Sequence, residues 1–180
     1  FPKGADVAYL AAGADFPDAL SGAAAAAQRG GPVLLTAKDA IPPSVKKELT
    51  ILKPREILIL GGPGAVSDKV LTAAKALAPT VTRADGLNRY ATSAAISQAT
   101  FAGGVPVAYV AVGTAFPDAL AGAAAAGVSG GPVLLVGAST IPSEVKAELK
   151  RLKPKKIVVL GGPGAVDDMV AVDLGDYVVQ

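Results

Sequence analysis

Short apolar runs alternate along the chain with longer segments whose apolar residues recur at helical spacing. The runs carry apolar residues on both faces, which predicts strands buried on both sides. Strands of this kind that alternate with helices predict a parallel sheet covered by helices, joined by right-handed crossovers. The predicted strands are residues 6–12, 32–36, 56–60 and 80–83, and the predicted helices are 19–28, 44–52, 65–77 and 88–100.

The pattern occurs twice, with an offset of 100 residues and no gap. About 42 of the 72 residue pairs from Phe1/Phe101 onward are identical. Such self-similarity predicts two copies of one unit. In the second copy, elements are expected to begin at residues 105, 116, 132, 142, 157 and 165.

The fold class that follows is α/β, with two tandem three-layer lobes and short parallel sheets of about four strands. We assign residues 1–88 to the first copy and residues 89–180 to the second. The second copy includes the inter-repeat helix 89–100 and has an incomplete C-terminal tail. The first copy lacks the helix that should precede Phe1.

Small residues dominate the composition, and this predicts a close approach of helices to sheets. Of 180 residues, 51% are hydrophobic and 21 are glycine, and there is no tryptophan. Helices 19–27 and 119–128 are apolar on nearly every face, so we expect the other lobe or another chain to cover them. The uncharged stretch 119–143 is divided at Gly130, Gly131 and Pro132 into pieces too short to span a membrane, so no membrane insertion is expected.

Charge and residue chemistry narrow the function. A net charge of +2 gives no argument for nucleic acid. The absence of cysteine and histidine excludes disulfides, thiol nucleophiles and the usual hydrolase triad. No candidate serine nucleophile is kept in both copies, since Ser21 pairs with Ala121 and Ser67 with Asp167. We therefore expect no catalysis, no cofactor and no metal, while a site present in one copy stays open.

Candidate ligand contacts gather where the carboxyl ends of the strands meet, because open parallel sheets bind ligands at that edge. The turns at Gly61-Gly62 and Gly161-Gly162 could present backbone N–H groups to an anion, or they could simply permit a tight turn. Asp18 and Asp118 open the following helices. They could bind a ligand or the neighbouring lobe, or stabilise the helix dipole alone.

A polar cluster follows the fourth strand, and its spacing is Arg83-x-x-Gly86-x-x-Arg89-Tyr90-x-Thr92. Arginine here could bind phosphate or carboxylate, or it could tie one repeat to the next by an ion pair. A second basic group recurs in both copies and is either solvated surface or a patch for a polyanion. Its members are Lys46, Lys53, Arg55, Lys146, Lys150, Arg151, Lys153, Lys155 and Lys156.

Five motifs in this order resemble the type 2 cell wall-binding repeat family of Gram-positive surface-layer, autolysin and adhesin-type proteins. They are F-P-D-A-L, G-G-P-V-L-L-T, I-P-x-x-V-K-x-E-L, I-L-G-G-P-G-A-V-S-D-x-V and R-x-x-G-x-x-R-Y-x-T. The resemblance implies Rossmann-like or Toprim-like lobes, commonly three in tandem around a pseudo-threefold axis. Here about two repeats are present, and the second lacks the Arg-Tyr tail.

The resemblance also implies an extracellular, non-catalytic module that anchors a surface protein non-covalently to an anionic, teichoic-acid-like wall polysaccharide. The implied partners are this polymer, together with a homo-oligomer or further repeats. The alternative is a small-molecule or nucleotide-binding α/β protein. The matching positions are Asp18, Gly61, Gly62, Arg83, Gly86, Arg89, Tyr90, Thr92, Asp118, Gly161 and Gly162.

Overall fold

The computed structural model describes residues 1–14, 17–114 and 116–179, with the backbone alone for 116–119. The first copy forms a four-stranded parallel sheet in the order β2-β1-β3-β4. Each strand is followed by a helix, as the alternating pattern predicts. The elements are β1 (Val7–Ala12), α1 (Pro17–Arg29), β2 (Val33–Thr36), α2 (Pro43–Leu52), β3 (Glu56–Leu60), α3 (Asp68–Ala74), β4 (Thr80–Ala84) and α4 (Arg89–Thr100).

The second copy repeats this arrangement with three described strands rather than about four. Its parallel sheet has the order β6-β5-β7. The register is the same as in the first copy, since Tyr9 pairs with Val33 and Tyr109 with Val133. The elements are β5 (Ala108–Val112), α5 (Phe116–Ser129), β6 (Val133–Val136), α6 (Ser143–Leu152), β7 (Ile157–Leu160), α7 (Asp168–Leu174) and the 3-10 helix η1 (Gly175–Tyr177).

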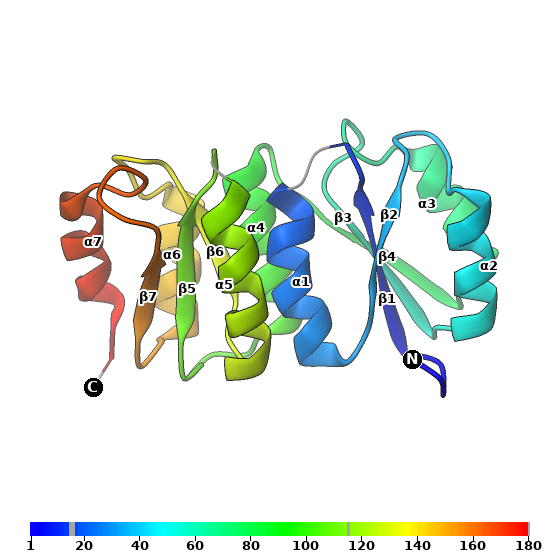
Figure 1. Cartoon of the computed structure of the whole chain (residues 1–180), viewed down its shortest axis with the longest axis horizontal. Coiled ribbons are helices and arrows are strands. Elements are labelled where there is room, and N and C mark those ends of the chain that lie inside the picture. The colour runs from blue at the N-terminus through cyan, green and yellow to red at the C-terminus, as the bar shows by residue number, and fades with distance from the viewer. Residues whose placement is uncertain (15–16, 115, 180) are drawn as a thin grey trace.

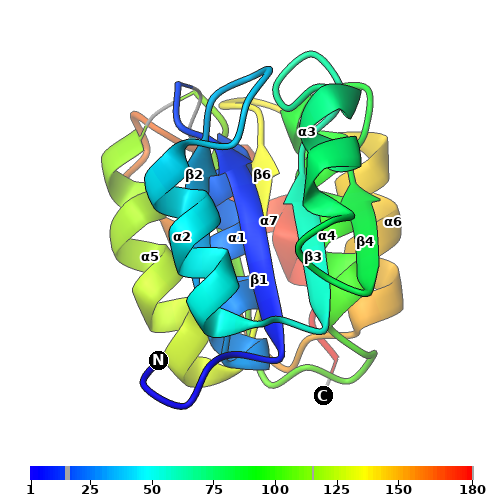
Figure 2. The same cartoon turned by 90° about the vertical axis from the view of Figure 1, so that its right-hand side faces the viewer.

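The predicted α/β class with two parallel-sheet lobes is thus confirmed. Helices α1, α4 and α5 lie between the two sheets, and α2 and α3 cover the outer face of the four-stranded sheet (Figure 1). Figure 2 shows the outer side of the first copy, where α2 and α3 lie in front of β1 and β3. Phe16, the first residue of the F-P-D-A-L motif, lies outside the described residues.

The close approach of helix to sheet expected from the small residues is present in both copies. A Cβ atom at Gly22 of α1 would overlap the Leu60 side chain of β3, and one at Gly122 of α5 would overlap Leu160 of β7. Glycine at these two positions therefore lets each helix lie directly on its sheet. No helix in the described part of the chain is both long and apolar enough to cross a membrane.

Two predicted helix starts are wrong by three residues, because α3 begins at Asp68 rather than Ala65, and α7 at Asp168 rather than Ala165. The Val66 side chain is buried, and Ser67 has an extended backbone with φ −68° and ψ 165°. The Ser67 N–H donates to the Lys38 carbonyl. The glycine turn is therefore separated from the helix by a short loop.

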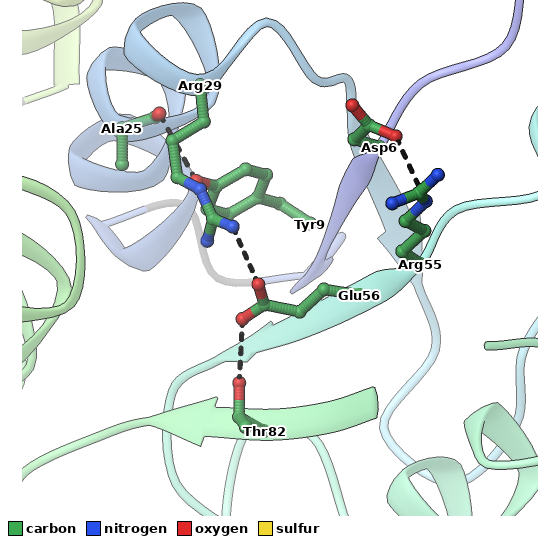
Figure 3. Close-up of polar contacts among 7 residues, drawn as sticks. All are labelled: Asp6, Tyr9, Ala25, Arg29, Arg55, Glu56 and Thr82. Carbon is green, nitrogen blue, oxygen red and sulfur yellow. Dashed lines mark hydrogen bonds and ion pairs between the residues drawn. The ribbon is translucent and has the colours of Figure 1, made fainter. Parts of the chain in front are cut away.

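A polar cluster ties α1 to the amino ends of β3 and β4 (Figure 3). Arg29 Nη2 donates to Glu56 Oε2 at 2.6 Å, and Thr82 Oγ1 donates to Glu56 Oε1 at 3.3 Å. The Tyr9 hydroxyl donates to the Ala25 carbonyl at 3.2 Å. The hydrogen bond from Arg29, more than its charge, holds the pKa of Glu56 below its ordinary value of 4.5.

Because this pKa is lowered on folding, Glu56 stabilises the fold above pH 4.5, and the contribution is lost as the pH falls through the folded pKa. We expect Arg29→Ala to lower the free energy of unfolding by about 1 kcal/mol at pH 7, since both side chains are partly exposed. The deficit should shrink as the pH falls through the folded pKa of Glu56. Urea titrations of both proteins at several pH values measure it. A deficit that stays constant with pH would contradict the assignment.

Candidate ligand-binding cleft

A cleft of about 400 Å³ lies at the carboxyl edge of the four-stranded sheet. Its walls are the start of α1, the turn after β3, the loop after β4 and the start of α4. The lining residues are Pro17, Asp18, Gly62, Pro63, Gly64, Ala65, Asp85, Gly86, Leu87, Asn88, Arg89 and Thr92.

Five of the positions singled out from the sequence line this cleft: Asp18, Gly62, Gly86, Arg89 and Thr92. Gly61, Arg83 and Tyr90 are not among its lining residues. Sequence reasoning missed Asp85, Leu87 and Asn88, although all three occupy variable positions of the Arg83–Thr92 motif. Their position in the loop that follows β4 could have predicted them, because this loop lies at the ligand-binding edge. Their residue types alone do not indicate a binding site.

The glycine turn uses much of its own hydrogen-bonding capacity. Gly61 has φ +91°, a conformation that favours glycine, and a Cβ atom there would overlap the Asp18 carboxylate. The Gly61 N–H donates to the Ala84 carbonyl, and the N–H groups of Ala65 and Val66 both donate to the Gly62 carbonyl. An anion at this turn would have to be held without those three donors.

Arg83 holds the glycine turn in place from behind the cleft. Its Nη1 donates to the Gly61 carbonyl at 2.6 Å and to the Val66 carbonyl at 2.8 Å. Its Nη2 lies 3.0 Å from Asp68 Oδ1, and the side chain is only 11% exposed. These contacts account for the arginine as a support of the binding edge.

The loop after β4 is fixed by caps at the start of α4. The Gly86 N–H donates to Thr92 Oγ1 at 3.1 Å, and Thr92 is buried. Asn88 Oδ1 accepts from the N–H groups of Tyr90 and Ala91, each at 2.9 Å. This N-cap satisfies two donors that the helix itself cannot pair. The caps leave Leu87 fully exposed at the rim of the cleft.

Arg89 and Tyr90 join the first copy to the second. Arg89 Nη1 donates to the Gly113 carbonyl at 2.6 Å, at the end of β5. A Cβ atom at Gly113 would come within 2.7 Å of the Tyr90 ring. The tie between repeats that we considered from the sequence is therefore present, but Arg89 makes it through a carbonyl rather than an ion pair.

Residues 3–71 and 83–171 match the family described as cell wall binding domain 2 (CWB2). The chain belongs to this family. CWB2 domains are cell wall binding modules of Gram-positive surface proteins, so the expected family, wall-binding role and location at the cell surface are confirmed at that level.

Two Bacillus subtilis (strain 168) proteins are similar to this CWB2 chain. The N-acetylmuramoyl-L-alanine amidase LytC is 30% identical over 92% of the chain and 33% of its own length. The amidase enhancer is 32% identical over 86% of the chain and 21% of its own length. The chain thus spans a third or less of these relatives.

Two solved structures from Clostridium difficile share the fold. Cwp6 has a TM-score of 0.88 and 27% identity, covering 97% of this chain and 28% of Cwp6. Cwp8 has a TM-score of 0.87 and 26% identity, covering 98% of this chain and 30% of Cwp8.

Within the CWB2 pair, the second copy repeats the glycine turn of the first. Gly161 has φ +98°, and Ala165 and Val166 donate to the Gly162 carbonyl as in the first copy. Gly161 and Gly162 are exposed, whereas Gly61 is buried. The backbone of Asp118 lies in α5, and its side chain is outside the described part. The sequence has no counterpart of the Arg83–Thr92 loop here.

Exposed basic residues lie at the opposite edge of the two sheets. Lys53 and Arg55 precede β3, and Lys153, Lys155 and Lys156 precede β7, so they lie at the amino ends of these strands. Lys53 and Lys153 end α2 and α6 in the left-handed conformation, with φ 49° and 47°. We call these five residues the basic edge. Both sheets point the same way, so their carboxyl edges lie on one side of the molecule (Figure 1).

Proposed function

We propose that this CWB2 pair anchors its parent protein non-covalently to an anionic, teichoic-acid-like polysaccharide of the cell wall. The basic edge supports an anionic ligand, because its exposed cations recur in both copies. Their side chains reach solvent and can attract a polyanion. Repeated weak contacts on one molecule suit a polymer, because each bound segment raises the effective concentration of the next.

The cleft and the basic edge differ in the chemistry they offer. Asp18 and Asp85 contribute two carboxylates to the cleft, and Arg89 contributes one cation. Carboxylates accept hydrogen bonds from sugar hydroxyls and repel phosphate. The exposed Leu87 at the rim can contact the apolar face of a sugar ring. The cleft therefore suits sugar units of the polymer, and the basic edge suits its charged groups.

One polymer chain can contact both regions. The five residues of β3 separate the two edges by about 17 Å along the strand. We propose that the pair acts by binding alone, and that other parts of the parent protein supply any catalysis. The alternative of a nucleotide site would need phosphate donors at the glycine turn, where three N–H groups are already paired.

Salt and charge variants test the proposal on purified walls. We expect retention to fall as salt rises, because exposed charges are screened over about 8 Å at physiological ionic strength. Lys153→Gln, Lys155→Gln and Lys156→Gln together should weaken retention several-fold. The matched control removes three exposed lysines elsewhere, by Lys38→Gln, Lys69→Gln and Lys75→Gln. If both triple variants lost retention equally, the net charge of the protein, and not the position of the lysines, would explain the effect.

The same assay separates the cleft from the basic edge. Leu87→Ala should weaken retention about fivefold, the equivalent of about 1 kcal/mol, with no change in Tm because the side chain is fully exposed. Walls stripped of the anionic polymer should retain none of the proteins. Retention that ignores salt, both lysine triples and Leu87→Ala would overturn the proposal.

Helix α5 exposes an apolar face that α1 buries in the first copy. Helix α1 packs between α4 and α5, as we expected for an apolar helix, and α5 packs against α1 and the second sheet while its remaining face is open. Val128 is 91% exposed, and Leu120 is half exposed where Leu20 is buried. We propose that a further repeat or a second copy of the chain covers this face. The exposed residues are Leu120, Ala121, Ala124, Ala125 and Val128.

We expect the isolated chain to self-associate as its concentration rises, because an apolar face of this size favours burial. Light scattering at several concentrations measures this. Leu120→Lys with Val128→Lys should abolish the association. The control pair, Met169→Lys with Val172→Lys on α7, should leave it unchanged, although both side chains are also exposed. A monomer at every concentration would contradict the idea.

A further inference from the structure

Two hollows lie at equivalent places in the two copies, at the amino edges of the sheets. The first measures about 410 Å³ and lies between the end of α2 and the chain that follows α3. The second measures about 430 Å³ and lies between the end of α6 and η1. Each residue that lines the second hollow has its counterpart, 100 residues earlier, in the lining of the first. The lining of the second hollow is Leu149, Lys150, Lys153, Asp176, Tyr177 and Val179.

A lysine in the lining of each hollow has a backbone conformation that favours glycine. Lys53 and Lys153 have φ 49° and 47°, and no other non-glycine residue in the described part of the chain has a positive φ. Helices that end in this conformation commonly have glycine there, because a Cβ atom is strained. Both lysines are exposed, and among the described residues neither makes an ion pair. Their charges are therefore available to an anion in each hollow.

The inner wall of each hollow is apolar, and it differs between the copies. Leu49 and Leu149 are fully buried, and Leu77 and Tyr177 are half-buried against the same cores. Beside the tyrosine, the second hollow has the exposed Asp176 where the first has an alanine. A tyrosine ring offers an apolar face and a hydroxyl, and a carboxylate accepts hydrogen bonds. The second hollow therefore suits a sugar ring, whereas leucine and alanine offer no hydrogen bond to one.

We propose that each hollow binds one anionic unit of the wall polymer, the first a phosphate group and the second an acidic sugar. This inference rests on the proposed function, and it gives Lys53 and Lys153 the leading part within the basic edge. In the first hollow, Arg55 adds a guanidinium that binds phosphate through two N–H groups. In the second, the two lysines attract the acidic group, while Tyr177 contacts the ring and Asp176 accepts from its hydroxyls.

NMR titrations of the isotope-labelled chain with glycerol 1-phosphate, glucuronate and glucose test this assignment. We expect glycerol 1-phosphate to shift the amide resonances of Lys53 and Arg55, and glucuronate to shift those of Lys153 and Tyr177. Uncharged glucose should shift neither set. Tyr177→Leu should weaken glucuronate binding about fivefold, and Leu77 at the equivalent place shows that a leucine fits there. Shifts confined to the cleft at the carboxyl edge, or equal shifts at every lysine, would overturn the proposal.

Retention on purified walls separates the hollows from the rest of the basic edge. Lys53→Gln with Lys153→Gln should weaken retention several-fold. The matched pair Lys155→Gln with Lys156→Gln removes the same charge from the same edge outside the lining of the second hollow, and should weaken retention clearly less. If both pairs lost retention equally while salt still released the protein, the proposed function would stand and the hollows would not be its sites. Retention that ignores salt would overturn both.

Lys153→Gly separates binding from a structural role of the lysine. Glycine relieves the positive φ, so the Tm should stay the same or rise by about 2 °C, while glucuronate binding and retention fall. A lysine that served only to stabilise the carboxyl end of α6 would give the opposite result, because its charge favours that end of the helix dipole. A lower Tm with unchanged glucuronate binding would therefore overturn the proposal.

Discussion

Arg83→Ala should lower the free energy of unfolding by about 2–4 kcal/mol, because the guanidinium is nearly buried and three groups depend on it. Its removal leaves the carbonyls of Gly61 and Val66 without their donor at the point where the glycine turn reverses. The turn forms one wall of the cleft. Wall retention should therefore fall together with the stability of this edge.

The control is Arg55→Ala, which removes the same charge from a side chain that is 87% exposed and only 3.6 Å from an equally exposed Asp6. This variant should cost well under 1 kcal/mol. Urea unfolding followed by circular dichroism compares the stability of the three proteins, and retention is measured for the parent and Arg83→Ala where both are folded. An Arg83→Ala protein with the parent stability and no retention would assign Arg83 to the ligand instead of the scaffold.

Much of the fold could be predicted from the sequence because its signals are local and repeated. Apolar runs with no polar face are sufficient to locate the strands, and the 100-residue offset carries each assignment into the second copy. Asp18 and the glycine turn could be placed at one edge because parallel strands end together. The cleft found there has Asp18, Gly62, Arg89 and Thr92 in its walls.

The partners of the arginines could not be predicted in the same way. Arg83 and Arg89 donate to the carbonyls of Gly61, Val66 and Gly113, and every residue has a carbonyl. No pattern of side chains therefore distinguishes these contacts from a ligand phosphate. The start of α3 was wrong for a related reason, since the Lys38 carbonyl that holds Ser67 is a backbone group far away in sequence.

The two copies also show that residues at equivalent positions of the repeat can differ in burial. Glu48 and Glu148 occupy the same position of the same motif, and only Glu148 is covered by α4 and paired with Arg151. The covering helix is a tertiary feature that neither motif reveals. The sequence differs at one position that reflects this difference in burial. The second copy has Arg151, which pairs with the buried Glu148, and the first copy has Ile51 at the same place.

Arg151→Ala should accordingly lower the free energy of unfolding by about 3–5 kcal/mol, because it leaves the fully buried Glu148 carboxylate without its cation. Arg151 Nε donates to Glu148 Oε2 at 2.8 Å, and Nη2 lies 2.6 Å from Oε1. Nη2 also donates to the Phe101 carbonyl, so the loss should loosen α4 from α6. The neighbouring exposed Lys150→Ala is the control and should change stability by less than about 0.5 kcal/mol.

A double-mutant cycle decides whether the buried charge is the cause. Arg151→Ile restores the residue found in the first copy, and Glu148→Leu removes the carboxylate. Together they should cost less than Arg151→Ile alone, because an apolar pair of similar volume leaves no uncompensated charge. Chemical unfolding of the four proteins measures the coupling. If the double variant were less stable than the single by the full cost of Glu148→Leu, the two side chains would act independently, and the stability of the α4–α6 junction would rest on the Ser97 and Phe101 contacts alone.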